Sequence, residues 1–345
     1  MSCPAITAEP TGQAPGARRR IGRGSVCKAV EEGPGTSPVR GERHKVSDTA
    51  TVTVDGGASG CRLAAFGADG ALRAGAVDGP ASLTLGEAQA WRHIARGLRT
   101  LAGELGLPPH WLPPVLCLGL AGALQRERRE RFIALLPASI ECRLVTDGHA
   151  QLLGASGGEP GACLAVGTGS VLHWLDGEGR DGMAGGWGFP AGDEGSGAWL
   201  GLRAVGAYLR ARDEGHLALS SGSPLAAPGS LFAALEKRIG TDVSSVQSWS
   251  TRTVSTELAS LAPLVVAAAE RGDPVAASLL DEGAVRCAAL FAIAPPDVPL
   301  YLVGGLAAVY RTRLPAHIRA RLREPRGGPL EGLLAIGRVP AERPA

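Results

Sequence analysis

The sequence predicts an α/β protein made of two related lobes, and two observations lead to this prediction. Each half of the chain opens with an apolar strand, a glycine-rich turn and a second strand, the first half near Thr51 and the second near Ala162. Behind each opening, further strand patterns alternate with segments of helical periodicity. We interpret the halves as an internal structural repeat rather than one dinucleotide-binding unit, and we expect a cleft where they meet.

In the first half, strand patterns come before helical ones. Residues 51–54 and 61–66 are apolar and flank a glycine-rich turn, and Asp69-Gly70 predicts a hairpin into a third strand at 72–77. Apolar residues then recur about every 3.6 residues from Glu87 to Leu105, which predicts an amphipathic helix. The remaining elements are a strand at 115–122, a helix at 126–136, a strand at 140–146 and a helix that opens at 147.

The second half repeats this opening and then becomes mainly helical. Strands are expected at 162–166 and 171–176 around the turn VGTGS, with a third near 179–188. Helical patterns cover 197–294, interrupted by a Ser-, Gly- and Pro-rich stretch at 220–230. A late strand at 299–303 ends in another glycine turn.

Length and composition limit the classes of function. The chain has 345 residues, enough for two domains, and its net charge of +2 favours neither a nucleic-acid nor a membrane partner. It holds no uncharged apolar run of about 20 residues, so no membrane span is expected. Its seven cysteines are scattered without a CxxC pair, which predicts reduced thiols rather than a zinc or iron–sulfur site.

Residues 1–48 differ from the rest of the chain. Proline, glycine and charge interrupt them throughout, so they are predicted to form a disordered tail without a signal peptide. The cluster Arg18 to Arg20 could touch nucleic acid, although a solvated tail is the plainer interpretation. We therefore expect a cytoplasmic protein whose folded part begins near Thr49.

Three glycine-rich turns follow apolar strands and are candidate phosphate-binding loops. Backbone amides and small hydroxyls in such turns cradle phosphate oxygens, and the set of three is more specific than any one turn. The chain contains neither GxxxxGK[ST] nor GxGxxG at these places, so the P-loop and the dinucleotide fingerprint are not met. The candidate residues are Gly56, Gly57, Ser59, Gly167, Thr168, Gly169, Ser170, Gly304 and Gly305.

Four acidic residues lie next to these turns or at strand ends. Asp147 ends a strand and opens a helix, so it could accept a proton from an attacking hydroxyl or simply cap its helix. Asp193 and Glu194 lie in the glycine-dense GGWGFPAGDEGSGAWLG, where close ligand contact competes with a loop or cap role. Asp55 precedes the first turn and suits a water-mediated Mg²⁺ contact or a turn. His149 and His173 are interpreted as ordinary polar residues rather than metal ligands.

Together these motifs resemble the actin-like ATPase superfamily and, within it, the BadF/BadG/BcrA/BcrD ATPase family. The resemblance covers roughly Thr51 to Arg338, and its most specific segment is GGWGFPAGDEGSGAWLG. It implies a two-lobed actin-like ATPase (ribonuclease H-like) fold of duplicated βββαβαβα units with an interlobe cleft. The implied lobes are residues 49–146, with a returning helix at about 328–338, and residues 147–327 with a helical insertion.

The resemblance also implies an activity and a role for each candidate residue. It implies a kinase that uses ATP and Mg²⁺ to phosphorylate glucosamine or N-acetylglucosamine at the 6-hydroxyl, with homodimerisation implied in the same way. Asp147 falls on the catalytic aspartate and Asp193 on the sugar-binding aspartate. Asp55 and the first two turns bind Mg²⁺ and the phosphates, and the third turn lies on the adenosine side. Glu194 and residues 80–86, including Ser82, are assigned to the sugar.

Departures from the family pattern leave two rival roles open. Ala58 and Ser59 replace glycine and threonine in the first turn, and Ser82 replaces a sugar-contacting asparagine. One branch of the family activates 2-hydroxyacyl-CoA dehydratases through a cluster bound by interface cysteines, whose glycine motifs this chain lacks. A sugar-sensing regulator that does no catalysis is the second rival, and the presence of both Asp147 and Asp193 speaks against it.

Overall fold

The computed structural model describes residues 49–215 and 228–338. Residues 1–48, which the sequence predicts to be a disordered tail, lie outside the described residues, as does most of the Ser-, Gly- and Pro-rich stretch at 220–230. The proposed division into lobes at residues 146 and 147 stays a prediction, as does the cleft between them.

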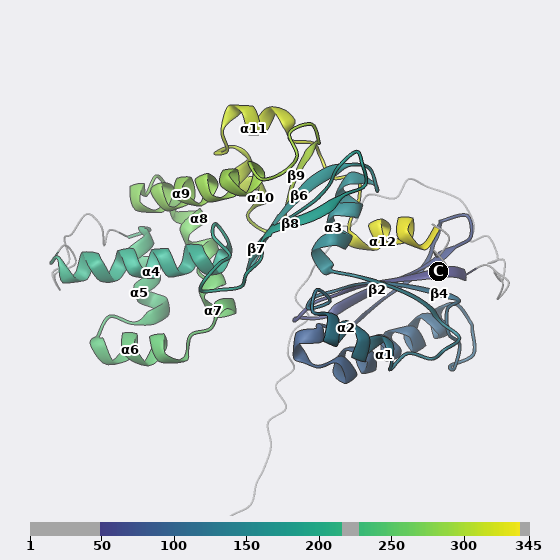
Figure 1. The fold of residues 1–345 in the computed structure, drawn as a ribbon. Coiled ribbons are helices and arrows are strands. Elements are labelled where there is room, and N and C mark those ends of the chain that lie inside the picture. The colour runs from purple at the N-terminus through teal and green to yellow at the C-terminus, as the bar shows by residue number, and fades with distance from the viewer. Residues whose placement is uncertain (1–48, 216–227, 339–345) are drawn as a thin grey trace, which may run out of the picture. The chain divides into compact units, whose positions relative to one another are not determined.

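The first half forms a five-stranded sheet in the order β3-β2-β1-β4-β5 (Figure 1). Neighbours β1, β2 and β3 run antiparallel through the predicted hairpins, and β1, β4 and β5 run parallel. The parallel strands carry buried apolar side chains because helices cover both faces of such sheets. The strand bounds are β1 Thr49–Gly56, β2 Cys61–Gly67, β3 Leu72–Asp78, β4 Val115–Leu120 and β5 Glu141–Val145.

Two helices and one short 3₁₀ turn cover one side of this sheet. Helix α1 (Glu87–Glu104) buries the apolar face that its periodicity predicts, including Ile94 and Leu98. Helix α2 (Arg126–Ile133) is shorter than the predicted 126–136, because its end tightens into i→i+3 turns before Pro137. The 3₁₀ turn η2 (Leu83–Leu85) lies between β3 and α1.

The second half repeats the strand order in a four-stranded sheet, β8-β7-β6-β9. Strands β6, β7 and β8 are antiparallel and β9 is parallel to β6, which confirms the predicted repeat. A fifth strand is reduced to a single bridge between Leu300 and Leu322 in the described part of this half, extended by the Arg323 amide that donates to the Leu300 carbonyl. The bounds are β6 Gly161–Val166, β7 Ser170–Leu175, β8 Asp181–Gly185 and β9 Leu300–Val303.

Helices form the larger part of the second half, as predicted for residues 197–294. Their buried faces form one core with the second sheet, centred on side chains such as Leu164, Leu200 and Tyr208. Figure 1 shows these helices gathered beside that sheet. The bounds are α4 Gly197–Asp213, α5 Leu231–Ile239, α6 Val243–Arg252, α7 Ser255–Ala259, α8 Ala262–Glu270, α9 Pro274–Phe291, α10 Ala307–Arg311 and α11 Ala316–Arg321.

Helices α3 (Asp147–Ser156) and α12 (Pro329–Arg338) connect the two sheets. On α3, Leu152 and Ala155 pack against the second sheet, whereas Ala150 packs with Cys117 of β4 and Leu333 of α12. The chain therefore returns at its C-terminal end to the first sheet, where the sequence predicts a returning helix.

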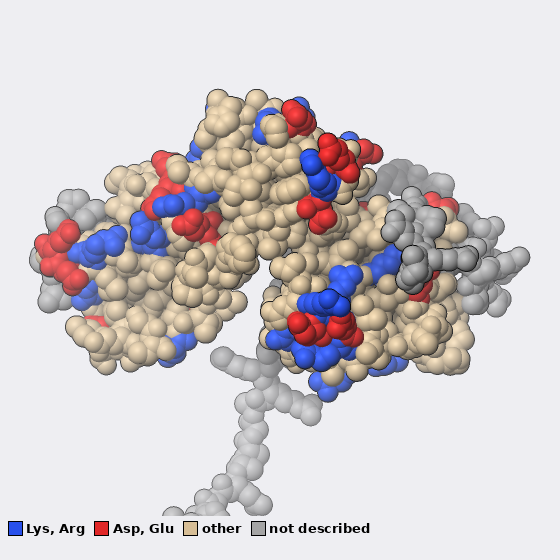
Figure 2. Space-filling view, in the orientation of Figure 1, with Lys and Arg blue, Asp and Glu red and all other residues tan. Residues whose placement is uncertain are grey.

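Charge is mixed on the face of the molecule that Figure 2 shows. Figure 2 shows basic and acidic side chains next to one another on the face over α1 and α2, where Arg126 pairs with Glu130 and Arg131 pairs with Glu87. Such intermixing agrees with the small net charge. Among the described helices, none has the length and apolar character that crossing a membrane requires.

Candidate functional site

The first glycine turn lies between β1 and β2. The Gly57 amide donates to the Gly60 carbonyl at 3.0 Å, which closes the turn. The Gly56 and Gly57 carbonyls accept from the amides of Ala121 and Ala81, so two later loops hold the turn from behind. Ser59 is exposed, and the turn therefore presents a hydroxyl and backbone amides to solvent where a phosphate could dock.

Asp55 at the end of β1 has a basic partner that the sequence analysis missed. Arg62 lies directly opposite Asp55 in the β1–β2 register, and its Nη2 lies 2.5 Å from Asp55 Oδ2. The Arg62 side chain is 60% exposed, whereas Asp55 is 18% exposed. Because its side chain is exposed, Arg62 can rotate towards an anion bound at the first glycine turn. Its position in the sequence, two residues after Gly60, is a signal from which this role could have been predicted.

The second glycine turn, between β6 and β7, is built against Asp193. The Ser170 amide donates to Asp193 Oδ1 at 3.3 Å, and Ser170 Oγ donates to the Glu194 carbonyl at 2.8 Å. A Cβ on Gly169 would lie 2.8 Å from Asp193 Oδ2, so only glycine allows this approach. Asp193 adopts a positive φ of 61°, unusual for a residue with a side chain. The structure thus places Asp193 at the second glycine turn, and its sugar contact stays a prediction, as does phosphate binding by this turn.

Glu194 is turned towards solvent and an arginine. Its carboxylate lies 3.5 Å from Arg286 Nη1 of α9, and both side chains are about half exposed. Such a surface ion pair is weak and can rearrange. The predicted role of Glu194 in sugar binding stays a prediction.

A cavity of about 460 Å³ opens between the second and third glycine turns and the helices α7 and α8. Its walls are mainly apolar, and Glu270 is the charged residue among them. An apolar slot with one acidic group and glycine turns at its floor suits a purine base with its ribose and phosphates. The sequence did not predict this cavity, because apolar residues in an ordinary helix give no sign that they line a binding site. The lining residues are Gly167, Thr168, Gly197, Ala259, Ala262, Pro263, Val266, Ala267, Glu270, Gly305 and Leu306.

Asp147 is free of the capping role that the sequence left open for it. Thr146 is the N-cap of α3, because its hydroxyl accepts from the His149 amide at 3.1 Å. The Asp147 side chain is exposed at the opening of the site, yet the protein atoms around it displace enough water to raise its pKa. The nearby Asp55 carboxylate raises the pKa further. A carboxylate with a raised pKa near a candidate phosphate-binding turn is suited to accept a proton.

Ser82 is buried, and its hydroxyl is engaged inside its own loop. Only 1% of the residue is exposed. Its Oγ lies 2.7 Å from Thr84 Oγ1 and 3.3 Å from the Ala121 carbonyl, and it accepts from the Thr84 amide. In this structure Ser82 shapes the loop rather than facing a ligand, so its predicted sugar contact would require the loop to rearrange.

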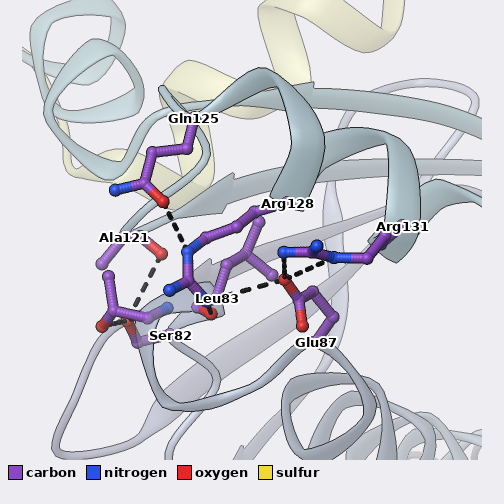
Figure 3. A network of polar contacts seen from close by, with 8 residues as sticks. Ser82, Leu83, Glu87, Ala121, Gln125, Arg128 and Arg131 are labelled. Carbon is purple, nitrogen blue, oxygen red and sulfur yellow. Dashed lines mark hydrogen bonds and ion pairs between the residues drawn. The ribbon is translucent and has the colours of Figure 1, made fainter.

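Both ends of the loop that contains Ser82 are anchored, and Figure 3 shows the contacts at the end next to α2. At the far end, Arg128 of α2 donates to the Leu83 carbonyl at 2.8 Å, and Arg131 pairs with Glu87 at 3.0 Å. At the near end, hydrogen bonds from Arg96 and His93 hold Asp78 at the end of β3, with Arg96 lowering the pKa of Asp78 most. The loop is thereby held between α1 and α2.

Arg128→Ala is expected to loosen this loop. Losing a hydrogen bond from a charged donor that is partly exposed should speed amide hydrogen exchange in residues 82–87 by about 5- to 20-fold. Arg126→Ala is the matched control on the same helix, because the Arg126–Glu130 pair is far more exposed. Hydrogen-exchange mass spectrometry compares the two variants, and equal exchange in both would show that Arg128 does not hold the loop.

Two sheets with the same strand order, glycine turns at matching places and a purine-sized cavity define an ATPase of the actin-like class. The chain belongs to the BadF/BadG/BcrA/BcrD ATPase family, whose model matches residues 52–306. The family assignment that the sequence predicts is therefore confirmed, and with it the use of ATP.

Characterised relatives and solved structures resemble most of the chain. It is 29% identical to the glucosamine kinase of Vibrio cholerae over 293 residues. The aligned region covers 84% of this chain and 96% of that protein. A Chromobacterium violaceum structure, provisionally assigned as an N-acetylglucosamine kinase, is 36% identical with a TM-score of 0.74 and covers 85% of this chain and all of that one. A Porphyromonas gingivalis structure at 18% identity and a TM-score of 0.60 shares the fold.

Proposed function

We propose that this protein transfers the γ-phosphoryl group of ATP to the 6-hydroxyl of an amino sugar, glucosamine or N-acetylglucosamine. The relatives that cover nearly its whole folded part are named as kinases of these sugars. The observation that carries the proposal is the cavity between the second and third glycine turns, because its apolar walls and glycine turns can seat a nucleotide.

The nucleotide is assigned to this cavity with its base against α8. The apolar side chains of Ala262 and Val266 would pack on the base, and Glu270 would accept from ribose hydroxyls. The phosphates would then extend over Gly167 to Ser170, with the first turn, at Gly56 to Ser59, as the opposing cradle. Arg62 would contact the same phosphates.

Asp55 fits the predicted role of holding Mg²⁺. One of its oxygens pairs with an exposed arginine that phosphate would attract away, and the carboxylate of Asp147 is close enough to interact with it. Asp55 would hold Mg²⁺ through water, with phosphate oxygens completing its coordination. Bound there, Mg²⁺ would neutralise phosphate charge.

Asp147 is proposed as the general base. Its carboxylate would accept the proton of the sugar 6-hydroxyl as that oxygen attacks phosphorus. Burial raises the pKa of Asp147, which makes its carboxylate a better proton acceptor than an ordinary aspartate. Asp193 and Glu194 remain proposed sugar contacts, and a cytoplasmic location and a homodimer are proposed with them.

The activator role receives no support from the described cysteines. Cys61, Cys117, Cys163 and Cys287 are buried and Cys142 is half-buried, and burial raises the pKa of each thiol to about 11 or 12. An interface cluster needs accessible thiolates. Cys3 and Cys27 lie outside the described residues.

A coupled ADP-release assay tests the proposal. The substrates are glucosamine, N-acetylglucosamine, glucose, N-acetylmannosamine and a sugar-free blank. We expect turnover that rises with one or both amino sugars and stays near the blank with the others. ATP hydrolysis that is the same with and without every sugar would contradict the kinase and favour the activator or sensor roles.

A further inference from the structure

A second cavity, of about 370 Å³, lies against the first turn of α3 and contains no residue assigned above to ATP or sugar. It is formed by α2, the end of β5, the start of α3, the edge strand β8 and its neighbour β7. Gly148, next to Asp147, approaches the His173 ring so closely that a Cβ would collide with it. The lining residues are Leu124, Arg129, Val145, Thr146, His149, His173, Asp181, Gly182 and Met183.

His173 is the buried residue that best indicates ligand binding in this cavity. It is only 7% exposed, yet its ring has no hydrogen-bond or ion-pair partner in the described part of the chain. Neither ring nitrogen is among the fully enclosed polar atoms that lack a hydrogen-bond partner, so both stay accessible at the cavity that His173 lines. Burial lowers the pKa of His173 to about 4, so the ring is neutral at pH 7 and offers one donor and one acceptor.

Three further polar side chains line this cavity, and none of them has a side-chain hydrogen bond to a described residue. His149 lies edge-on to His173, with 6.4 Å between the ring centroids, and burial lowers its pKa as well. Arg129 and Asp181 carry opposite charges, and neither forms a side-chain hydrogen bond or ion pair with any described residue. Asp181 is exposed and interacts electrostatically with both imidazoles. The cavity therefore offers donors from Arg129, acceptors from Asp181, and both from each imidazole.

This set of groups matches a ligand rich in hydroxyls. An anion would be repelled by Asp181 and a cation by Arg129, whereas each hydroxyl both donates and accepts. Leu124, Val145 and Met183 add apolar walls that suit the C–H faces of a sugar ring. The described residues hold no cluster of three side chains that could bind a metal.

We propose that this cavity is a second binding site for a saccharide unit, held by His149, His173, Arg129 and Asp181. The site is separate from the residues assigned to phosphoryl transfer, although it touches the turn that carries Asp147. It does not depend on the proposed kinase activity, because binding is measured without ATP.

Methyl NMR of the full chain can test this proposal directly. The chain holds two methionines, and one of them, Met183, lines the cavity. A ¹³C-methyl-methionine spectrum is therefore simple, and Met183→Leu identifies the signal. We expect glucosamine, N-acetylglucosamine or its β-1,4-linked dimer to shift the Met183 signal saturably. His173→Leu should weaken this binding about tenfold or more, since it removes a buried hydrogen-bonding partner.

Control variants separate this site from the catalytic one. His110→Leu changes an exposed histidine outside the cavity and should leave the titration unchanged, as should Asp147→Asn. A Met183 signal that no sugar shifts, or identical titrations for the wild type and His173→Leu, would overturn the proposal. Thermal melting of His173→Leu verifies folding. Sugar-stimulated ADP release is scored separately, so either proposal can fail alone.

Discussion

Asp147→Asn is expected to lower sugar-stimulated ADP release by about 10²- to 10⁴-fold, the usual range for losing a general base. Asparagine keeps the size of the side chain but cannot take a proton. Thr146, rather than Asp147, caps α3, so the substitution leaves the helix start intact and the effect reports on chemistry. Steady-state assays at saturating ATP and sugar measure it.

The control for this substitution is Asp297→Asn. Asp297 is exposed and has no ion-pair partner in the described structure, so its loss of charge should leave turnover unchanged. Equal melting temperatures for both variants would exclude unfolding as the cause. Turnover of Asp147→Asn within a few-fold of the wild type would refute the base assignment, even if the sugar specificity held.

The environment of Asp147 also sets the direction of the pH dependence. Desolvation and the Asp55 carboxylate raise the pKa of Asp147 above its ordinary 3.8. A base is active when deprotonated, so kcat/KM should fall as the pH drops through this raised value. Replacing Asp55 by Asn removes the repulsion between the carboxylates, and the acid limb should then move to lower pH.

Much of the fold could be predicted because it depends on local patterns. Hairpins such as that at Asp69-Gly70, and the periodic apolar face of α1, are encoded by neighbouring residues. In the second sheet, a single bridge at Leu322 stands where the first sheet has a fifth strand. The sequence could not predict this difference, because strand pairing depends on residues far apart in the chain.

The candidate site was predicted only in part, for a physical reason. Glycine turns and strand-end carboxylates such as Asp147 stand out in sequence because they break apolar patterns. Tertiary packing determines the other features. It directs the Ser82 hydroxyl into its own loop, brings Arg128 to the Leu83 carbonyl and places α8 along the 460 Å³ cavity. His173 illustrates the same limit, since only the structure shows that it is buried and lines a cavity with His149.

Gly304→Ala is expected to destabilise the protein by about 2–4 kcal/mol, from backbone strain and a steric clash together. Gly304 adopts a φ of 100°, which residues with a side chain rarely occupy. A Cβ there would also collide with the backbone of Val166, whose carbonyl accepts from the Leu306 amide and so ties the third turn to β6. Urea unfolding measures the change.

Gly305→Ala is the matched neighbour that separates folding from ligand binding. Its φ is not positive, and a Cβ there would meet nothing within 4 Å, so the free energy of unfolding should stay within about 0.5 kcal/mol of the wild type. Gly305 does line the 460 Å³ cavity, so an added methyl would narrow the space assigned to the nucleotide. We therefore expect Gly305→Ala to weaken ATP binding without loss of stability. Equal destabilisation of the two variants would show that the third turn needs two flexible positions, and unchanged ATP affinity in Gly305→Ala would move the nucleotide away from this turn.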